Sequence, residues 1–145
     1  MIAAIPHHIG CAVKQLEDSC ATYAAALGLN RRSRSFDVVS QQVRVCFVEL
    51  GSGFYLELIS PLNERAKLAS FLQTGFYHLC FLVEDLGRAR EHLRSHRYVA
   101  LPAFDSEAFA GNICQFFLSP QKHLIELAQM STGEFNGFFS ENLDG

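Results

Sequence analysis

Short runs of apolar residues, several of them alternating with polar ones, recur along the chain and are separated by glycine, proline or charged residues. Runs of this length and punctuation are typical of strands with a buried face. The strands that we predict span residues 7–13, 43–50, 54–60, 77–83, 97–101, 112–118 and 123–129. Gly51-Ser52-Gly53 and residues 119–122 each stand between two of these runs, which predicts two hairpins.

Helical spacing of apolar residues replaces the alternating pattern in three segments. Residues 16–27 show this spacing and end before Gly28, a residue that commonly terminates helices. We predict further helices at residues 64–73 and 86–96. Residues 29–40 carry weaker signals and are predicted as an irregular strand or loop.

The C-terminal tail has a different composition from the rest of the chain. Beyond Met130 it contains Phe135, Phe138 and Phe139 among glycine, asparagine and serine. The pattern leaves two interpretations open, in which the tail covers an apolar patch of the same chain or forms a subunit contact. We take residues 1–130 as a single domain and residues 131–145 as the tail.

The opening strand of the chain is repeated in its second half. Residues 6–16 and 76–86 align at an offset of 70 residues, with His8 on His78 and Leu16 on Leu86. A repeat at a fixed offset predicts two structurally related halves. We expect module one at about residues 5–63 and module two at about residues 75–130.

Each half also contains one acidic residue in a second apolar strand. Glu57 follows His8 by 49 positions, and Glu126 follows His78 by 48. An ionisable group within an apolar strand is costly unless it is paired or bound to a cation. A single such histidine is more often a core residue than a ligand, but the ordered pair in both halves predicts one shared metal site.

Two imidazoles and two carboxylates form a donor set that suits several divalent metals. Zinc, cobalt, manganese, nickel and iron(II) all accept nitrogen and oxygen ligands, with room for water or substrate. Such a site supports Lewis-acid chemistry at a carbonyl oxygen, and a nearby carboxylate can move a proton on the adjacent carbon.

Composition narrows the class of protein further. The chain has 145 residues, 49% hydrophobic and 19% charged, with a net charge of -3. This balance disfavours nucleic acid as a partner, and no apolar run reaches the roughly 20 residues needed to cross a membrane. We therefore expect a cytoplasmic globular protein. Its five cysteines lack a CxxC spacing and are predicted to be reduced core thiols.

Other candidate residues are interpreted more conservatively. His7 should point away from His8 in a regular strand, so we expect it at the surface or the strand end. His92 and His96 have metal-binding spacing, but the charged residues around them predict a solvated helix face. A phosphate- or carboxylate-binding patch and a solvated edge segment are both compatible with the neighbouring arginines, Arg31, Arg32 and Arg34.

Four blocks of sequence resemble the vicinal oxygen chelate superfamily, which contains glyoxalases and bleomycin resistance proteins, and within it the methylmalonyl-CoA epimerase family. The blocks are HHIGCAVKQLEDSCATYAAALGL, VRVCFVELGSGFYLELISPL, YHLCFLVEDLGRAREHLR and HLIELAQ. The resemblance implies an α+β fold in which two βαβββ modules form a curled, mostly antiparallel sheet around a central metal cavity. The epimerase pattern usually has two adjacent histidines where this chain has Tyr77-His78, and a longer loop after the residue matching Pro120.

The resemblance also implies roles for individual residues. His8, Glu57, His78 and Glu126 match the metal ligands of the family, which use a divalent ion such as cobalt, zinc, nickel or manganese. Glu126, with Glu57 as its partner on the opposite face, would move a proton alpha to a chelated carbonyl. The expected protein is therefore a metal-dependent epimerase or isomerase for a small molecule such as an acyl-CoA thioester, and a homodimer.

Two alternatives remain on the sequence alone. A glyoxalase I-like lyase uses nearly the same residues, and a drug-sequestering module of the same fold binds a small molecule without chemistry. A ring-cleaving dioxygenase needs only one carboxylate beside two histidines, so Glu57 counts against it.

Overall fold

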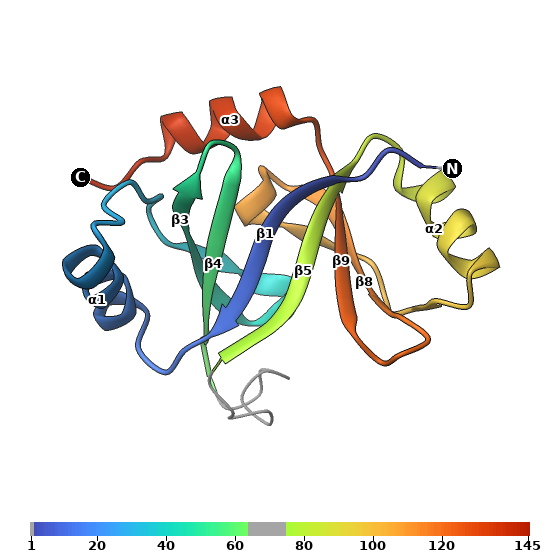
Figure 1. Cartoon of the computed structure of the whole chain (residues 1–145), viewed down its shortest axis with the longest axis horizontal. Coiled ribbons are helices and arrows are strands. Elements are labelled where there is room, and N and C mark those ends of the chain that lie inside the picture. The colour runs from blue at the N-terminus through green and yellow to red at the C-terminus, as the bar shows by residue number, and fades with distance from the viewer. Residues whose placement is uncertain (1, 64–74) are drawn as a thin grey trace.

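The computed structural model describes residues 2–63 and 75–145, which form one curled sheet flanked by three α-helices (Figure 1). The strands follow the order β2-β3-β4-β1-β5-β9-β8-β6, and β7 pairs with β8 beside β6. Their bounds are β1 Ile5–Ala12, β2 Phe36–Val38, β3 Val43–Gly51, β4 Phe54–Pro61, β5 Gly75–Val83, β6 Val99–Ala100, β7 Phe104–Ser106, β8 Asn112–Leu118 and β9 Leu124–Gln129. The predicted helix at residues 64–73 lies outside the described residues.

The repeat in the sequence corresponds to a repeat in the pairing of strands. In module one, β1 pairs in parallel with β4, and in module two β5 pairs in parallel with β9. β1 and β5 pair with each other antiparallel, so the two modules join at the centre of the sheet. The other pairings are antiparallel. The predicted α+β fold with a curled, mostly antiparallel sheet is therefore confirmed.

Two helices cover the outer face of the sheet, one for each module. α1 (Leu16–Leu27) buries Leu16 and Cys20 against β3 and β4, and it ends at Gly28, whose φ of 69° is the left-handed conformation that glycine adopts readily. α2 (Leu86–Ser95) begins at Asp85, whose side chain accepts a hydrogen bond from the Arg88 N–H. In Figure 1 the two helices stand at opposite ends of the sheet.

The tail forms a third helix, α3 (Thr132–Glu141), which closes one end of the curled sheet (Figure 1). Ser131 and Glu134 form a reciprocal capping box at its start. Phe135 and Phe139 are buried in the core inside the curl, each contributing about 1.5–3 kcal/mol of apolar burial. The tail therefore covers an apolar patch of its own chain.

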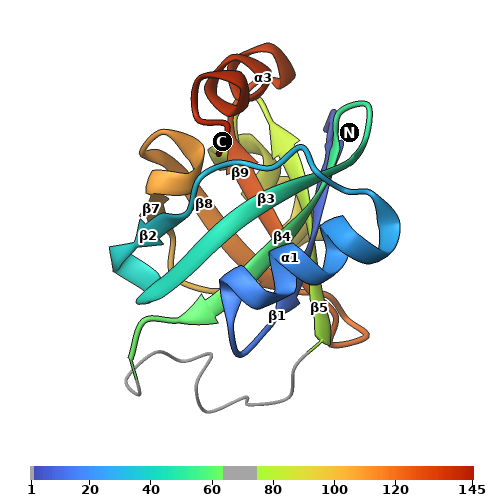
Figure 2. The ribbon, with the colours of Figure 1, turned by 90° about the vertical axis from the view of Figure 1, so that its left-hand side faces the viewer.

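The curl brings the two edges of the sheet together. Residues 29–40, predicted as an irregular strand or loop, form β2 and the start of the 3-10 helix η1 (Val39–Gln41). η1 packs against β7 and against the matching 3-10 helix η3 (Glu107–Phe109) of module two. The Ser40 hydroxyl donates to the Asp105 carbonyl at 2.9 Å, and Figure 2 shows β2 and β7 side by side.

Two predictions about the chain as a whole can be compared with the structure. All five cysteines are unpaired and buried, as expected, although the sulfurs of Cys20 and Cys46 lie only 2.9 Å apart. Among the described residues, no helix is long and apolar enough to span a membrane.

Candidate metal centre

The four residues singled out by the repeat lie on four adjacent strands at the middle of the sheet. His8 is on β1, Glu57 on β4, His78 on β5 and Glu126 on β9. Gly10 pairs with both Glu57 and His78, and the equivalent residue of module two, Cys80, pairs with both His8 and Glu126. This near-twofold register places one histidine and one glutamate from each module at the same level of the sheet.

Ligand atoms of these side chains converge on one point. The two Nε2 atoms of His8 and His78 are 3.0 Å apart. Glu57 Oε1 lies 3.3 Å from His8 Nε2 and 3.6 Å from His78 Nε2, and Glu126 Oε1 lies 3.3 Å from both. Two ligand atoms about 2.1 Å from one cation lie about 3.0 Å apart at a right angle and about 3.4 Å at the tetrahedral angle. The residues therefore fit a divalent cation.

Burial makes this cluster costly without a cation. His8 is completely buried, and Glu57, His78 and Glu126 are 4–6% exposed. Although Glu126 Oε1 is close to both imidazoles, it has no hydrogen-bond partner of suitable geometry among the described residues. Since a buried carboxylate oxygen without a well-aligned hydrogen bond is unfavourable, these positions favour a ligand set over ordinary core as the explanation of the cluster.

The pKa shifts within the cluster also favour a bound cation. Burial alone would lower the pKa of His8, but the Glu57 and Glu126 carboxylates raise it to about 9. Burial would raise the pKa of Glu126, but the two imidazoles hold it well below its usual range. In the absence of metal, the cluster therefore keeps a proton on His8 and a negative charge on Glu126, and a cation would replace that proton.

The comparison with known sequences agrees with the fold. The sequence pattern of the glyoxalase/bleomycin resistance protein/dioxygenase superfamily matches residues 7–132, most of the chain. The chain belongs to this superfamily. An ethylmalonyl-CoA/methylmalonyl-CoA epimerase of Cereibacter sphaeroides is 30% identical over 131 residues, covering 86% of this chain and 96% of the relative.

Two solved structures have the same fold. A hypothetical protein of Bacillus halodurans superposes with a TM-score of 0.79 and 24% identity, covering 89% of this chain and 96% of the other. Methylmalonyl-CoA epimerase of Mycobacterium tuberculosis superposes with a TM-score of 0.74 and 26% identity, covering 88% and 91%. The match over nearly the full length of both chains supports the two-module architecture.

Gly10 has a specific role in this superfamily member. The imidazole ring of His78 lies directly over Gly10, and a Cβ atom added there would be 2.6 Å from Nε2 and closer still to two other ring atoms. No side chain can be accommodated without moving the ring. The absence of a side chain at position 10 therefore sets the position of His78.

His7 is placed differently from the prediction. We expected it at the surface or the strand end, but it is only 2% exposed, and its Nδ1 lies 2.8 Å from Nδ1 of His8. The pairing of β1 with β5 shifts register between Pro6 and His8, so His7 is the extra residue of a β-bulge. The bulge breaks the alternation of faces, and both histidines turn into the interior.

The two converging histidines have different surroundings. Phe47 and Phe109, both completely buried, pack beside His8. Beside His78 lie Tyr77 and Phe116, which are only half-buried. Burial, and then the carboxylates of Glu57 and Glu126, raise the pKa of Tyr77, so its hydroxyl stays a hydrogen-bond donor. From the sequence, Tyr77 was noted only as a departure from the epimerase pattern, and Phe116 was not singled out.

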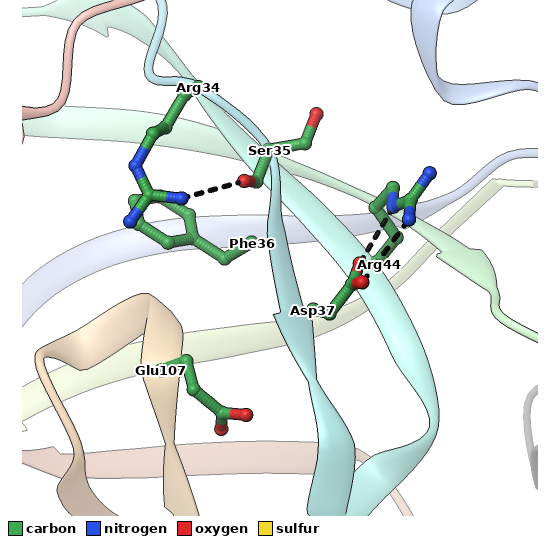
Figure 3. A pocket seen from close by; sticks show the side chains of 6 residues that line it. All are labelled: Arg34, Ser35, Phe36, Asp37, Arg44 and Glu107. Atoms are coloured by element: carbon green, nitrogen blue, oxygen red, sulfur yellow. Dashed lines mark hydrogen bonds and ion pairs between the residues drawn. The ribbon is translucent and has the colours of Figure 1, made fainter.

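The arginine segment is engaged in contacts within the chain. Arg31 pairs with Glu49 at 3.2 Å, and Arg32 pairs with Glu17 at 3.2 Å and with Asp144 at 2.7 Å. Arg34 stacks over the ring of Phe36 in a surface hollow of about 400 Å³ (Figure 3). The hollow is lined by Arg34, Ser35, Phe36, Asp37, Arg44 and Glu107. It contains none of the four converging residues, and Arg44 is held by Asp37 at 2.7 Å.

Proposed function

We propose that the protein is a metal-dependent epimerase or isomerase that moves a proton alpha to the thioester carbonyl of a substituted malonyl-CoA or a related acyl-CoA. The observation that supports this proposal most directly is the convergence of two imidazoles and two carboxylates within 3.0–3.6 Å. The similarity to the Cereibacter epimerase supports the choice of acyl-CoA substrate.

Under this proposal, the four side chains hold the cation, and the two carboxylates among them also move the proton. A divalent cation bound there would supply Lewis-acid polarisation of the carbonyl oxygen, which acidifies the adjacent C–H bond. Glu126 is the proposed proton acceptor, because its carboxylate lies beside the two imidazoles, next to the place where a chelated carbonyl would be held. Glu57 comes from the other module and is the proposed partner that exchanges a proton on the opposite face of the substrate.

The surroundings of the cluster favour this chemistry. Fully buried rings on the His8 side exclude water, which strengthens electrostatic interactions at the centre. The half-buried side, next to His78, would admit the substrate. We retain the homodimer and the cytoplasmic location as predictions from the sequence.

Deuterium exchange tests the proposal. Metal-loaded protein is incubated with methylmalonyl-CoA or ethylmalonyl-CoA in heavy water, and deuterium at the alpha carbon is measured by mass spectrometry against a protein-free blank. We expect rapid exchange that falls about 100-fold to 10,000-fold in Glu126→Gln, the usual contribution of a general base. Glu126→Gln keeps an oxygen ligand, so its metal content should change far less than its activity.

A matched control and two competing outcomes make the test decisive. Glu91→Gln, whose side chain is 72% exposed on α2, should exchange at the wild-type rate. If only a glutathione hemithioacetal is converted, the protein is a lyase of the glyoxalase type. If neither class of substrate reacts with the metal-loaded protein, but small molecules bind, the sequestering module replaces the enzyme.

A further inference from the structure

Behind the proposed metal centre, His7 contacts the nitrogen of His8 that faces away from the other three converging side chains. Its Nδ1 lies 2.8 Å from His8 Nδ1, while His8 Nε2 faces Glu57, His78 and Glu126. The two nitrogens of the His8 ring therefore have separate partners. One is directed at the centre and the other at His7.

The surroundings of His7 favour a neutral imidazole. Its ring packs against four aromatic residues, of which Phe135 of α3 is nearest, with ring centroids 4.1 Å apart. The other three are Phe47, Tyr55 and Phe109. His7 Nε2 is buried and has no hydrogen-bond partner among the described residues. An imidazolium in such an apolar enclosure would lack a compensating charge, so His7 carries one ring proton.

The tautomers of the pair follow from this geometry. To bind a cation through Nε2, His8 must carry its proton on Nδ1. That N–H needs an acceptor, and the unprotonated Nδ1 of a neutral His7 is at hydrogen-bond distance. The proton of His7 is then on Nε2, among the aromatic rings.

We propose that His7 is a positioning residue, which accepts a hydrogen bond from His8 Nδ1–H and thereby holds the Nε2 lone pair of His8 on the metal centre. This inference rests on the proposed function. Phe135 of the C-terminal helix holds the His7 ring in place, so α3 supports the metal centre through His7. His78 has no equivalent support, because its Nδ1 is buried without a hydrogen-bond partner among the described residues.

Metal affinity of the unreacted protein provides the first test. Zinc and cobalt(II) affinities are measured by competition with a chelator for wild type, His7→Phe and His7→Asn. Phenylalanine fills the aromatic enclosure without an acceptor, and we expect about 10-fold to 100-fold weaker binding. Asparagine offers an oxygen near the place of Nδ1 and should restore affinity to within about threefold of wild type, a factor that corresponds to less than one neutral hydrogen bond. The exposed His123 supplies the matched control, His123→Asn, with unchanged affinity.

Nitrogen NMR of the zinc-loaded protein provides the second test. The inference predicts a slowly exchanging proton on His8 Nδ1 and a scalar coupling across the hydrogen bond between the two Nδ1 atoms. Both signals should disappear in His7→Phe. Thermal unfolding of the metal-free variants checks that each is folded.

Each contrary outcome has a distinct meaning. Equal zinc affinity of His7→Phe and wild type, or failure of His7→Asn to restore it, would overturn the positioning role and leave the metal centre intact. Two zinc ions per chain would also overturn it, because His7, His8 and Cys80 would then be ligands of a second ion. A wild-type protein that binds no zinc or cobalt would overturn this inference and the proposed function together.

Discussion

The two modules place equivalent histidines at one centre, but they hold them by different means. His8 is completely buried, with His7 at its second nitrogen and closed aromatic packing beside it. His78 has its ring over Gly10, and its neighbours Tyr77 and Phe116 are half-buried. The repeat thus preserves the positions of the two histidines, while the residues that surround them differ. The aromatic packing is closed beside His8 and less closed beside His78.

The largest effect is expected from adding a side chain at Gly10, where the ring of His78 occupies the space that a Cβ would take. In Gly10→Ala the added methyl group would overlap the imidazole of His78, so the ring must leave the centre. Loss of a hydrogen-bond partner behind a metal ligand weakens metal binding by up to roughly 100-fold. Loss of the ligand itself should weaken zinc binding by more than this. Overpacking should also destabilise the protein by about 1–3 kcal/mol.

Gly51→Ala is the matched control for this substitution. Gly51 also lies in a strand, and an added Cβ would meet nothing within 4 Å. Chelator competition and thermal unfolding should leave it close to wild type. If Gly10→Ala binds zinc as tightly as Gly51→Ala, the absence of a side chain at position 10 does not determine where the ring of His78 lies.

A pH titration addresses the His8 side and should show the next largest effect. Because the folded pKa of His8 is about 9, above its ordinary 6.5, the protonated histidine stabilises the metal-free protein fully below about pH 6.5. This contribution is lost as the pH rises through about 9. A bound cation must displace the same proton, so metal affinity should rise about tenfold per pH unit well below pH 9, and about 50-fold in all between pH 7 and 9.

Chelator competition at several pH values checks this expectation, with unfolding of the metal-free protein in parallel. Glu57→Gln removes the first of the charges that raise the pKa of His8, so its affinity should level off at a lower pH. Metal affinity that does not change between pH 7 and 9 would show that His8 carries no proton in the metal-free protein.

The smallest effect is expected from a substitution beside His78. Tyr77→Phe removes a hydroxyl beside His78 that can donate to an acyl-CoA carboxylate or carbonyl. A lost hydrogen bond of about 0.5–1.5 kcal/mol corresponds to a KM that is about twofold to tenfold higher. Metal affinity should not change. Tyr98→Phe, which alters a tyrosine packed in the separate core beneath α2, should leave KM unchanged. A change in metal affinity without a change in KM would place Tyr77 with the ligands instead.

The sequence was sufficient for the features that depend on pattern. The helix at residues 16–27 and the strand at residues 112–118 have the predicted bounds, because apolar spacing and glycine stops determine them locally. The four converging residues were found because a repeat pairs a histidine with a glutamate in each half. Each residue alone would have been read as part of the core.

Two features could not be fully predicted from the sequence, for physical reasons. The orientation of His7 depends on a β-bulge, and strict alternation of faces gives the opposite answer until the bulge is known. The helix α3 did carry a signal, since Ser131 and Glu134 have capping-box spacing before the phenylalanines of the tail. Its docking on the core, by contrast, depends on contacts between residues distant in sequence, such as Phe135 with His7.

The central claim is that His8, Glu57, His78 and Glu126 hold one cation, and X-ray absorption of the cobalt(II)-loaded protein tests it most directly. The account predicts one cobalt per chain, with two imidazole nitrogens and two carboxylate oxygens at about 2.0–2.2 Å, and loss of one imidazole in His8→Ala or His78→Ala. Cobalt that is absent, or whose ligands are unchanged in both variants, would contradict the account.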